Sequence, residues 1–258
     1  MSTGRWSAAN LPAPVSGIRA RSRVLISGGS RGIGRAICLE FGRAGWQVAV
    51  HFRERKDEAA SVAASVESVG GEAVCYQADI RKAHQVTTMV RNLVHHWGHL
   101  DVMICNAGIA SSRLLLRLSP EEWASVIETN LTGTFHCLQA VGQHMLERGQ
   151  GTVIIIGSFA GIHGQPGQAA YAASKAGLLG LIKTAAREWG PSNVRVNAVF
   201  PGRHSTELAA TSQSHPVGTD AHVLCRTPDL SEVARSVYQL ALMRDASGQV
   251  WNLDSRIF

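Results

Sequence analysis

RVLISGGSRGIG, at residues 23–34, is the stretch that decides the fold of this 258-residue chain. A short apolar run at 24–27 leads through clustered glycines into a helical pattern that begins near residue 32. Such a turn lets the backbone approach a pyrophosphate, whose charge is stabilised at the helix N-terminus. The spacing Gly-x-x-x-Gly-x-Gly differs from Gly-x-Gly-x-x-Gly and from the Gly-Lys-Ser/Thr phosphate loop. We therefore expect a dinucleotide-binding turn here, with an ordinary tight turn as the alternative.

The alternation of strand and helix patterns continues along the chain. Strands are expected at the Val- and Ile-rich runs 24–27, 47–52, 73–76, 102–105, 152–156, 194–199 and 249–253. Helices are expected at about 32–44, 57–69, 83–97, 120–147, 171–189 and 229–243. Strands that alternate with helices form parallel sheets covered on both faces. The pattern predicts an α/β fold: a single-domain, Rossmann-type, doubly wound parallel sheet of about seven strands.

The chain is expected to form one domain with two loosely patterned segments. Residues 1–22 hold Gly, Pro, Ser and Ala without periodicity and are interpreted as a flexible leader. Residues 23–258 form the domain, because no Pro/Gly/Ser-rich linker and no repeat of about 20–50 residues divides them. Within the domain, the polar segment at about 203–226 is expected to be a lid over the substrate.

The composition excludes several classes of protein. The chain is globular, with 45% hydrophobic and 17% charged residues. No run reaches the roughly 18 apolar residues that cross a bilayer, and the N-terminus lacks the apolar core of a secretory signal. The net charge of +6 arises in residues 1–60, where ten Lys and Arg face four Asp and Glu. A nucleic-acid binder usually carries a basic face with interleaved aromatic residues, and this sequence does not show one. We therefore do not expect the chain to bind nucleic acid.

Cysteines and histidines bear on compartment and metal binding. The five cysteines are Cys38, Cys75, Cys105, Cys137 and Cys225. They include no Cys-x-x-Cys pair and most lie in apolar runs, so we expect buried free thiols and a cytoplasmic protein. Three histidines at positions 95, 96 and 99 are interrupted by a glycine and have no acidic or Cys ligand beside them. We expect no metal site there.

Further motifs follow the glycine-rich turn in a fixed order. After the later expected strands come Asn106-Ala107-Gly108, Ser158 and Pro201-Gly202, with Asn130 inside the long fourth helix and Tyr171-x-x-x-Lys175 thirteen positions after the serine. From Arg23 to the C-terminus, this set resembles the short-chain dehydrogenase/reductase family. The resemblance implies a nicotinamide cofactor and four catalytic residues: Asn130, Ser158, Tyr171 and Lys175.

The proposed chemistry also follows from the residue types. Tyr171 and Lys175 are four positions apart and lie on one face of a helix. A nearby ammonium favours ionisation of a phenol, whose ordinary pKa is about 10, so Tyr171 can act as general acid or base. Ser158 would donate a hydrogen bond to the substrate carbonyl. The resemblance adds that Lys175 holds the nicotinamide ribose and that Asn130 holds a water for proton relay. The alternative is a surface Tyr–Lys pair, a loop serine and a helix-kinking asparagine.

Charge after the second expected strand bears on the choice of cofactor. NAD-specific folds usually place a carboxylate there, whereas this chain has Phe52 followed by Arg53. Arg31 and Arg53 would suit a 2′-phosphate, which predicts NADP(H), although both could be ordinary solvated arginines. The expected cofactor contacts are Gly28, Ser30, Arg31, Gly32, Ile33, Gly34, Arg53, Asp79, Ile80, Asn106, Ala107, Gly108, Tyr171, Lys175, Pro201, Gly202 and Thr206.

The run at 161–177 is similar to 3-oxoacyl-acyl-carrier-protein reductases of type II fatty-acid synthesis. That resemblance implies NADPH-dependent reduction of a 3-oxoacyl thioester, delivered by an acidic acyl carrier protein that would suit a basic chain. It also implies a homotetramer built through the long fourth and fifth helices. Two alternatives remain open: another keto/alcohol substrate, such as a polyketide, sterol or sugar, and a catalytically weak NADP(H)-sensing regulator.

Overall fold

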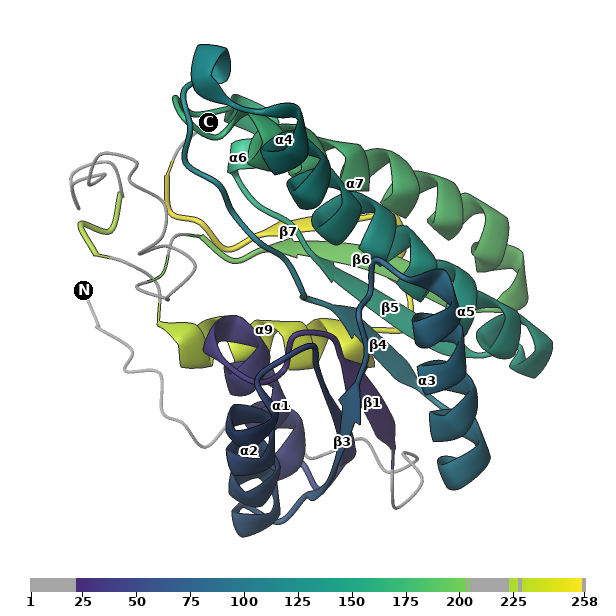
Figure 1. Cartoon of the computed structure of the whole chain (residues 1–258). Coiled ribbons are helices and arrows are strands. Elements are labelled where there is room, and N and C mark those ends of the chain that lie inside the picture. Colours follow the sequence, from purple (N-terminus) through teal and green to yellow (C-terminus); the bar gives the residue numbers. More distant parts are fainter. Residues whose placement is uncertain (1–21, 203, 205–222, 227–228, 257–258) are drawn as a thin grey trace, which may run out of the picture.

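The computed structural model describes residues 22–202, 204, 223–226 and 229–256 (Figure 1). Its centre is a seven-stranded parallel sheet in the order β3-β2-β1-β4-β5-β6-β7. The strands are β1 Arg23–Ile26, β2 Gln47–Phe52, β3 Glu72–Gln77, β4 Val102–Cys105, β5 Gly151–Ile156, β6 Val194–Phe200 and β7 Val250–Asn252. The expected leader at 1–22 and most of the expected lid, with Arg203 and Thr206, lie outside the described residues.

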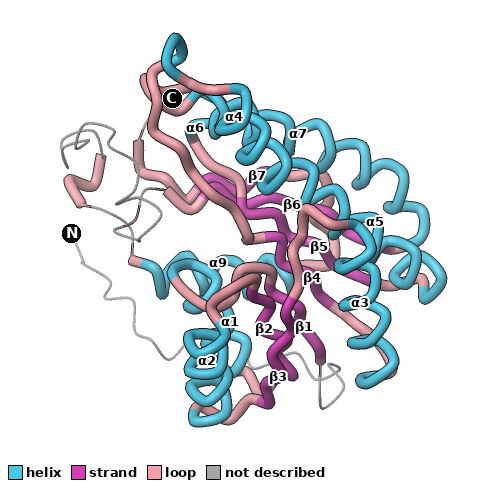
Figure 2. Tube along the Cα trace, in the orientation of Figure 1, coloured by secondary structure: helices cyan, strands magenta, loops and turns pink. Residues whose placement is uncertain are grey.

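Helices cover both faces of the sheet (Figures 1 and 2). The helices are α1 Gly32–Arg43, α2 Lys56–Ser68, α3 Ala83–Trp97, α4 Pro120–Ile127, α5 Gly133–Arg148, α6 Ala160–His163, α7 Ala169–Trp189 and α9 Leu230–Leu242, with single 3₁₀ turns at Leu115–Arg117 and Gly190–Ser192. One hydrophobic core joins α3, α5 and α7 to the sheet, and the other joins α1, α2 and α9 to it. The predicted Rossmann-type α/β fold is confirmed.

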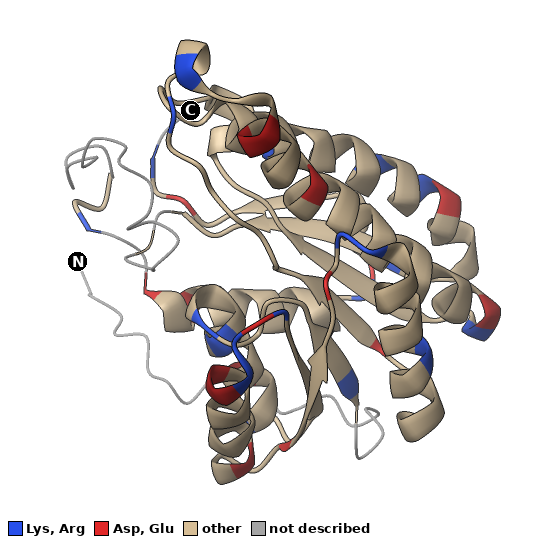
Figure 3. Cartoon of the chain, viewed as in Figure 1, with Lys and Arg blue, Asp and Glu red and all other residues tan. Residues whose placement is uncertain are grey.

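Residues of the same strand alternate between the two cores. In β1, Leu25 belongs to the core under α3, α5 and α7, while Val24 and Ile26 belong to the other. This alternation is the period-two geometry of a strand, and it explains why strands covered on both faces appear as continuous apolar runs. Figure 3 shows Lys, Arg, Asp and Glu mainly on loops and outer helix faces. Because the strands are filled with apolar residues of the two cores, we look for reactive polar side chains at the strand ends.

The predicted helix at 120–147 is interrupted, which corrects the sequence-based expectation. A π-helical turn, Glu128–Thr132, separates α4 from α5. Within it, Asn130 is fully buried and bonds sideways to the backbone of Ile109 rather than facing solvent. Single-turn π-bulges inside α-helices occur frequently at functional sites. The predicted helix start is confirmed: Ser119 and Glu122 form a reciprocal capping box.

Burial of the cysteines differs from the expectation at two positions. Cys38, Cys105 and Cys137 are buried, but Cys75 and Cys225 are exposed. Cys75 lies on β3, which within the described part of the chain is an edge strand paired with β2. Among the described residues, no three His, Cys, Asp or Glu gather as a possible metal site. None of the helices in the described ranges is both long and apolar enough to cross a membrane.

The strand order determines where a ligand can bind. β1 lies between β2 and β4, so the chain winds outward from β1 in both directions. Loops after β1 and β4 therefore leave the sheet on opposite sides and open a crevice at its carboxyl edge. This switch point is the place to look for a functional site.

Candidate active site

The glycine-rich turn after β1 is fastened to the end of β4. The Asn106 side-chain amide donates hydrogen bonds to the carbonyl oxygens of Ser27 and Gly28, at 3.1 and 3.0 Å. The Ser27 hydroxyl oxygen accepts hydrogen bonds from the backbone amides of Asn106 and Ala107, at 2.9 and 3.1 Å. Gly28 has a φ of +65°, which glycine adopts readily. The turn and the Asn106 segment thus form one rigid rim.

The start of α1 is suited to an anion. A Cβ added at Gly34 would lie 2.2 Å from the Gly28 carbonyl oxygen, so this close packing requires glycine. Arg31 occupies the N-cap position without a side-chain capping hydrogen bond. The first amides of a helix lack intrahelical acceptors and carry the positive end of its dipole. A phosphate group is therefore a natural partner for this end of α1.

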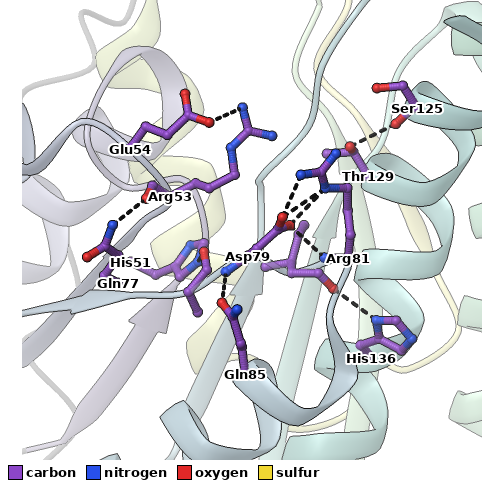
Figure 4. Close-up of polar contacts among 12 residues, drawn as sticks. His51, Arg53, Glu54, Gln77, Asp79, Arg81, Gln85, Ser125, Thr129 and His136 are labelled. Carbon is purple, nitrogen blue, oxygen red and sulfur yellow. Dashed lines mark hydrogen bonds and ion pairs between the residues drawn. The ribbon is translucent and has the colours of Figure 1, made fainter. Parts of the chain in front are cut away.

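Polar side chains line the neighbouring ends of β2 and β3 (Figure 4). The Arg81 guanidinium binds the Asp79 carboxylate through Nε at 2.9 and 3.0 Å and through Nη2 at 2.5 Å. These hydrogen bonds, opposed by desolvation, are the main cause that lowers the pKa of Asp79 to about 2. Sequence reasoning missed Arg81, although its position two residues after Asp79 was a usable signal. The pair places a fixed carboxylate at the edge of the crevice.

Arg53 lies close to this pair. Its guanidinium is 2.8 Å from the Glu54 carboxylate and also contributes to the lowered pKa of Asp79. Ile80 is buried and packs against Gly133, the first residue of α5. That Arg31 and Arg53 converge on a common ligand stays a prediction.

Ser158, Tyr171 and Lys175 lie together beside the end of β5. The Ser158 hydroxyl is hydrogen-bonded to the Tyr171 phenol. Lys175 Nζ lies 5.8 Å from the centre of the Tyr171 ring and donates to the Ile156 carbonyl oxygen at 2.7 Å. The structure thus brings a hydroxyl, a phenol and an ammonium to one place.

Burial perturbs both titratable groups of this cluster. Burial raises the pKa of Tyr171. The hydrogen bond from Ser158 lowers the same pKa, but this effect is smaller than that of burial. Burial lowers the pKa of Lys175 to about 8, and the nearby Cys105 opposes this shift. A phenol and an amine whose pKa values are shifted in a cleft are typical of proton-transfer sites.

Asn130 connects the π-turn to α7 through the interior. Its Oδ1 accepts from the Ile109 amide at 2.8 Å, and its Nδ2 donates to the Ile109 carbonyl at 2.9 Å and to the Ser174 hydroxyl oxygen at 3.0 Å. Ser174 in turn donates to the Tyr171 carbonyl oxygen at 2.7 Å. The side chain of Asn130 is thereby committed to holding the helix that carries Tyr171. Ser174 was missed in the sequence, where it is a polar residue next to Lys175.

The remaining expected residues lie at other strand ends of the same edge. Gly108 packs against Asn130, since a Cβ there would be 3.1 Å from the Asn130 Oδ1. Pro201 follows β6 and accepts a hydrogen bond of 2.7 Å from the buried His204 imidazole. The turn residues Ser30, Gly32 and Ile33 lie at the N-terminal end of α1, and Gly202 follows Pro201.

A stack of side chains that the sequence did not predict lies behind Ser158. The Arg256 guanidinium lies 4.3 Å from the centre of the Phe159 ring, and Phe159 stacks on His163 at 4.3 Å between ring centres. Arg256 is held by the buried carboxylate of Asp254, at 2.9 and 3.0 Å from Nε. The C-terminal segment therefore packs against the residue that follows the candidate catalytic serine.

Comparisons with known proteins agree with this geometry. A profile of the short chain dehydrogenase family matches residues 22–216. The 3-oxoacyl-acyl-carrier-protein reductase FabG of Staphylococcus epidermidis is 44% identical over 178 residues, 69% of this chain and 73% of that protein. The 3-oxoacyl-acyl-carrier-protein reductase of Synechocystis is 38% identical over 233 residues, 89% of this chain and 94% of that protein. A solved dehydrogenase/reductase from Sinorhizobium meliloti superposes with a TM-score of 0.84 at 29% identity, covering 91% of this chain and 94% of the other.

Proposed function

Because this chain belongs to the short-chain dehydrogenase/reductase family, we propose that it reduces a 3-oxoacyl thioester to the 3-hydroxyacyl form with NADPH. The family assignment makes it an oxidoreductase. The observation that carries the proposal is the cluster of Ser158, Tyr171 and Lys175 at the carboxyl edge of the sheet. It combines a proton donor with a hydrogen-bond donor for a carbonyl oxygen.

The described residues fit a dinucleotide. The close approach of Gly34 to Gly28 forms a turn that any Cβ would disrupt, and the N-terminus of α1 lacks a side-chain cap. Together they favour a pyrophosphate at the start of α1. When bound, a nicotinamide cofactor supplies the hydride for carbonyl reduction. Lys175 would hold the nicotinamide ribose, and Asp79 and Ile80 the adenine side.

Each residue of the cluster has a distinct task in the proposed reaction. Ser158 donates a hydrogen bond to the substrate carbonyl oxygen, where negative charge develops. Tyr171 transfers its phenolic proton to the same oxygen. The Lys175 ammonium stabilises the phenolate that remains, because an opposite charge nearby favours the ionised form. Asn130 acts through Ser174 on the backbone of Tyr171 and keeps the phenol in place.

NADP(H) is the proposed cofactor because of the charges after β1 and β2. Phe52 stands where an NAD-binding carboxylate is usual, and Arg53 follows it. Arg53 is exposed and near Asp79, at the side of the crevice where adenosine would lie. Guanidinium groups bind phosphate strongly, and NADH has no 2′-phosphate for them to bind.

The proposed substrate is an acyl chain on an acidic carrier protein. The names of the Staphylococcus and Synechocystis relatives support this class. Beside the site, Leu114, Leu115 and Leu116 are 57%, 71% and 101% exposed, between Arg113 and Arg117. An exposed apolar segment flanked by basic residues suits an acyl chain carried by an acidic partner. We further propose a homotetramer built through the helices that carry Asn130 and Tyr171.

NADPH oxidation tests the function directly. Acetoacetyl thioester on acyl carrier protein, the same thioester on coenzyme A, and a panel of unrelated ketones are compared at matched concentrations. Turnover of the carrier-bound thioester is the expected result. Turnover of unrelated ketones alone would show that the substrate belongs to another class of keto compound. Tight NADPH binding without turnover of any ketone would instead identify a sensing protein.

A further inference from the structure

His51 is a buried polar residue that the proposed reaction does not use. It lies near the end of β2 with 2% of its surface exposed (Figure 4). Its Nδ1 accepts a hydrogen bond from the Gly28 amide at 3.0 Å, and its Nε2 donates to the Ala78 carbonyl oxygen at 2.9 Å. One imidazole thus bridges the glycine-rich turn and the residue that precedes Asp79.

This pair of contacts requires one neutral form of the ring. Nδ1 faces an N–H donor and must carry a lone pair, while Nε2 faces a carbonyl oxygen and must carry the proton. Burial favours the same form, because it lowers the pKa of His51 to about 4. Both ring nitrogens are therefore satisfied in a site closed to solvent.

The backbone reinforces the bridge from both sides. The Gly29 amide donates to the His51 carbonyl oxygen at 2.9 Å, and the Ala78 amide donates to the Phe52 carbonyl oxygen at 3.0 Å. These bonds fix the main chain of the three segments, whereas the imidazole fixes the Gly28 amide itself. The turn is held by His51 on one side and by Asn106 on the other.

The two bridged segments are the two ends of the expected nucleotide site. Gly28 opens the turn that leads to the N-terminus of α1, and Ala78 leads directly to Asp79 and Ile80. A dinucleotide must reach its pyrophosphate site and its adenine site at once, so the separation of these segments matters for affinity. A rigid ring sets this separation more closely than a flexible side chain would.

We propose that His51 is a positioning residue for the dinucleotide, which it affects by fixing the glycine-rich turn relative to the adenine side. The proposal rests on the proposed function for the identity of the ligand. It predicts a change in cofactor affinity with little change in the chemical step, because Ser158, Tyr171 and Lys175 lie at a different strand end. A residue that served only stability would lower the thermal midpoint and leave the NADPH Kd unchanged.

The test compares three variants in NADPH binding, followed by fluorescence without any substrate. His51→Leu leaves the Gly28 amide and the Ala78 carbonyl unpaired and should raise the NADPH Kd about tenfold. His51→Asn keeps an acceptor toward Gly28 and should raise it about threefold. Val48→Ala is the matched control: Val48 is fully buried on the same strand, and its loss should lower the thermal midpoint without changing Kd.

Turnover at saturating NADPH gives a second readout. For His51→Leu, kcat should stay within about threefold of wild type while KM for NADPH rises. Unchanged Kd in His51→Leu, or an equal rise in Val48→Ala at a similar thermal midpoint, would overturn the inference. If His51→Leu does not fold, His51→Asn decides, and an unchanged Kd overturns it. A wild-type protein that binds no nicotinamide dinucleotide would refute the proposed function as well.

Discussion

The Lys175 ammonium lies 5.8 Å from the centre of the Tyr171 ring, and one helix carries both side chains. The ammonium is held in place by the Ile156 carbonyl at the end of β5, and the phenol is hydrogen-bonded to Ser158 just beyond that strand. The hydrogen bonds of Lys175 to Ile156 and of Ser158 to Tyr171 therefore tie α7 to the end of β5 and to the residues that follow it. Such a fixed arrangement favours proton transfer to an oxygen bound between Ser158 and Tyr171.

Replacing Tyr171 by Phe should remove the proton donor and keep the ring. We expect kcat to fall about 10²- to 10⁴-fold, the usual contribution of a general acid. NADPH affinity should stay within about twofold, because the proposed role of the hydroxyl is toward the substrate oxygen and the ring is kept. Steady-state NADPH oxidation and fluorescence titration measure the two quantities. Retention of wild-type kcat would show that another group supplies the proton.

The rate of reduction should decline as pH rises above about 8. The pKa of Lys175 is lowered to about 8 by burial, so the ammonium is present below that pH and lost above it. Without the ammonium, the phenolate left after proton transfer loses its stabilising charge. The pH profile of kcat/KM reports this limb, and Lys175→Met should abolish it along with most activity. A flat profile between pH 7 and roughly 9.5 would contradict the role of Lys175.

The preference for NADPH over NADH should depend on two arginines. Arg31→Ala combined with Arg53→Ala removes both guanidinium groups expected at the 2′-phosphate. Since hydrogen bonds to charged groups are each worth about 1.5–3 kcal/mol, NADPH KM should rise tenfold or more, with little effect on NADH. The ratio of kcat/KM for the two cofactors measures the change. Arg91→Ala, an exposed residue on α3, serves as a charge-matched control.

Acid should destabilise the protein through His51. The unfolded His51 has a pKa of 6.5 and the folded one about 4, so between these values the unfolded chain takes up a proton that the folded chain does not. The contribution of neutral His51 to the free energy of unfolding is therefore complete above pH 6.5 and declines as the pH falls toward 4. The total decline is at most about 3 kcal/mol.

The measurement is urea unfolding of wild type and His51→Asn at several pH values from 7 to about 4. The difference in unfolding free energy between the two proteins cancels the other titrating groups, which both share. Nearby Asp79 has a pKa of about 2 and stays ionised across this range. A difference that does not change with pH would show that the folded His51 accepts a proton as readily as the unfolded one.

The sequence was sufficient for the sheet and its helices because their signals are local. The run from Arg23 to Gly34 carries its own strand, turn and helix pattern, and the structure places these elements there. The π-turn was not predictable, because it depends on Asn130 reaching Ile109, which is 21 residues away in the sequence. A helical pattern alone does not show which residues a tertiary contact will pull out of register.

The same distinction holds within the candidate site. Ser158, Tyr171 and Lys175 could be named from spacing and resemblance, and the structure brings them together. The bridge made by His51 and the stack of Arg256 on Phe159 could not be named, because each joins segments that the sequence does not relate. Spacing and resemblance identify residues that belong to a shared motif, whereas the contacts of His51 and Arg256 join segments that carry no such motif.

The stack of Arg256 on Phe159 has a practical consequence for handling the protein. The Arg256 guanidinium lies against the ring of Phe159, the residue that follows Ser158, so a bulky group attached at Arg256 would crowd the neighbour of the candidate catalytic serine. Proteolytic loss of Arg256 during storage would remove the same contact. Preparations intended for enzymology are best checked by mass spectrometry for an intact segment from Asp254 to Arg256.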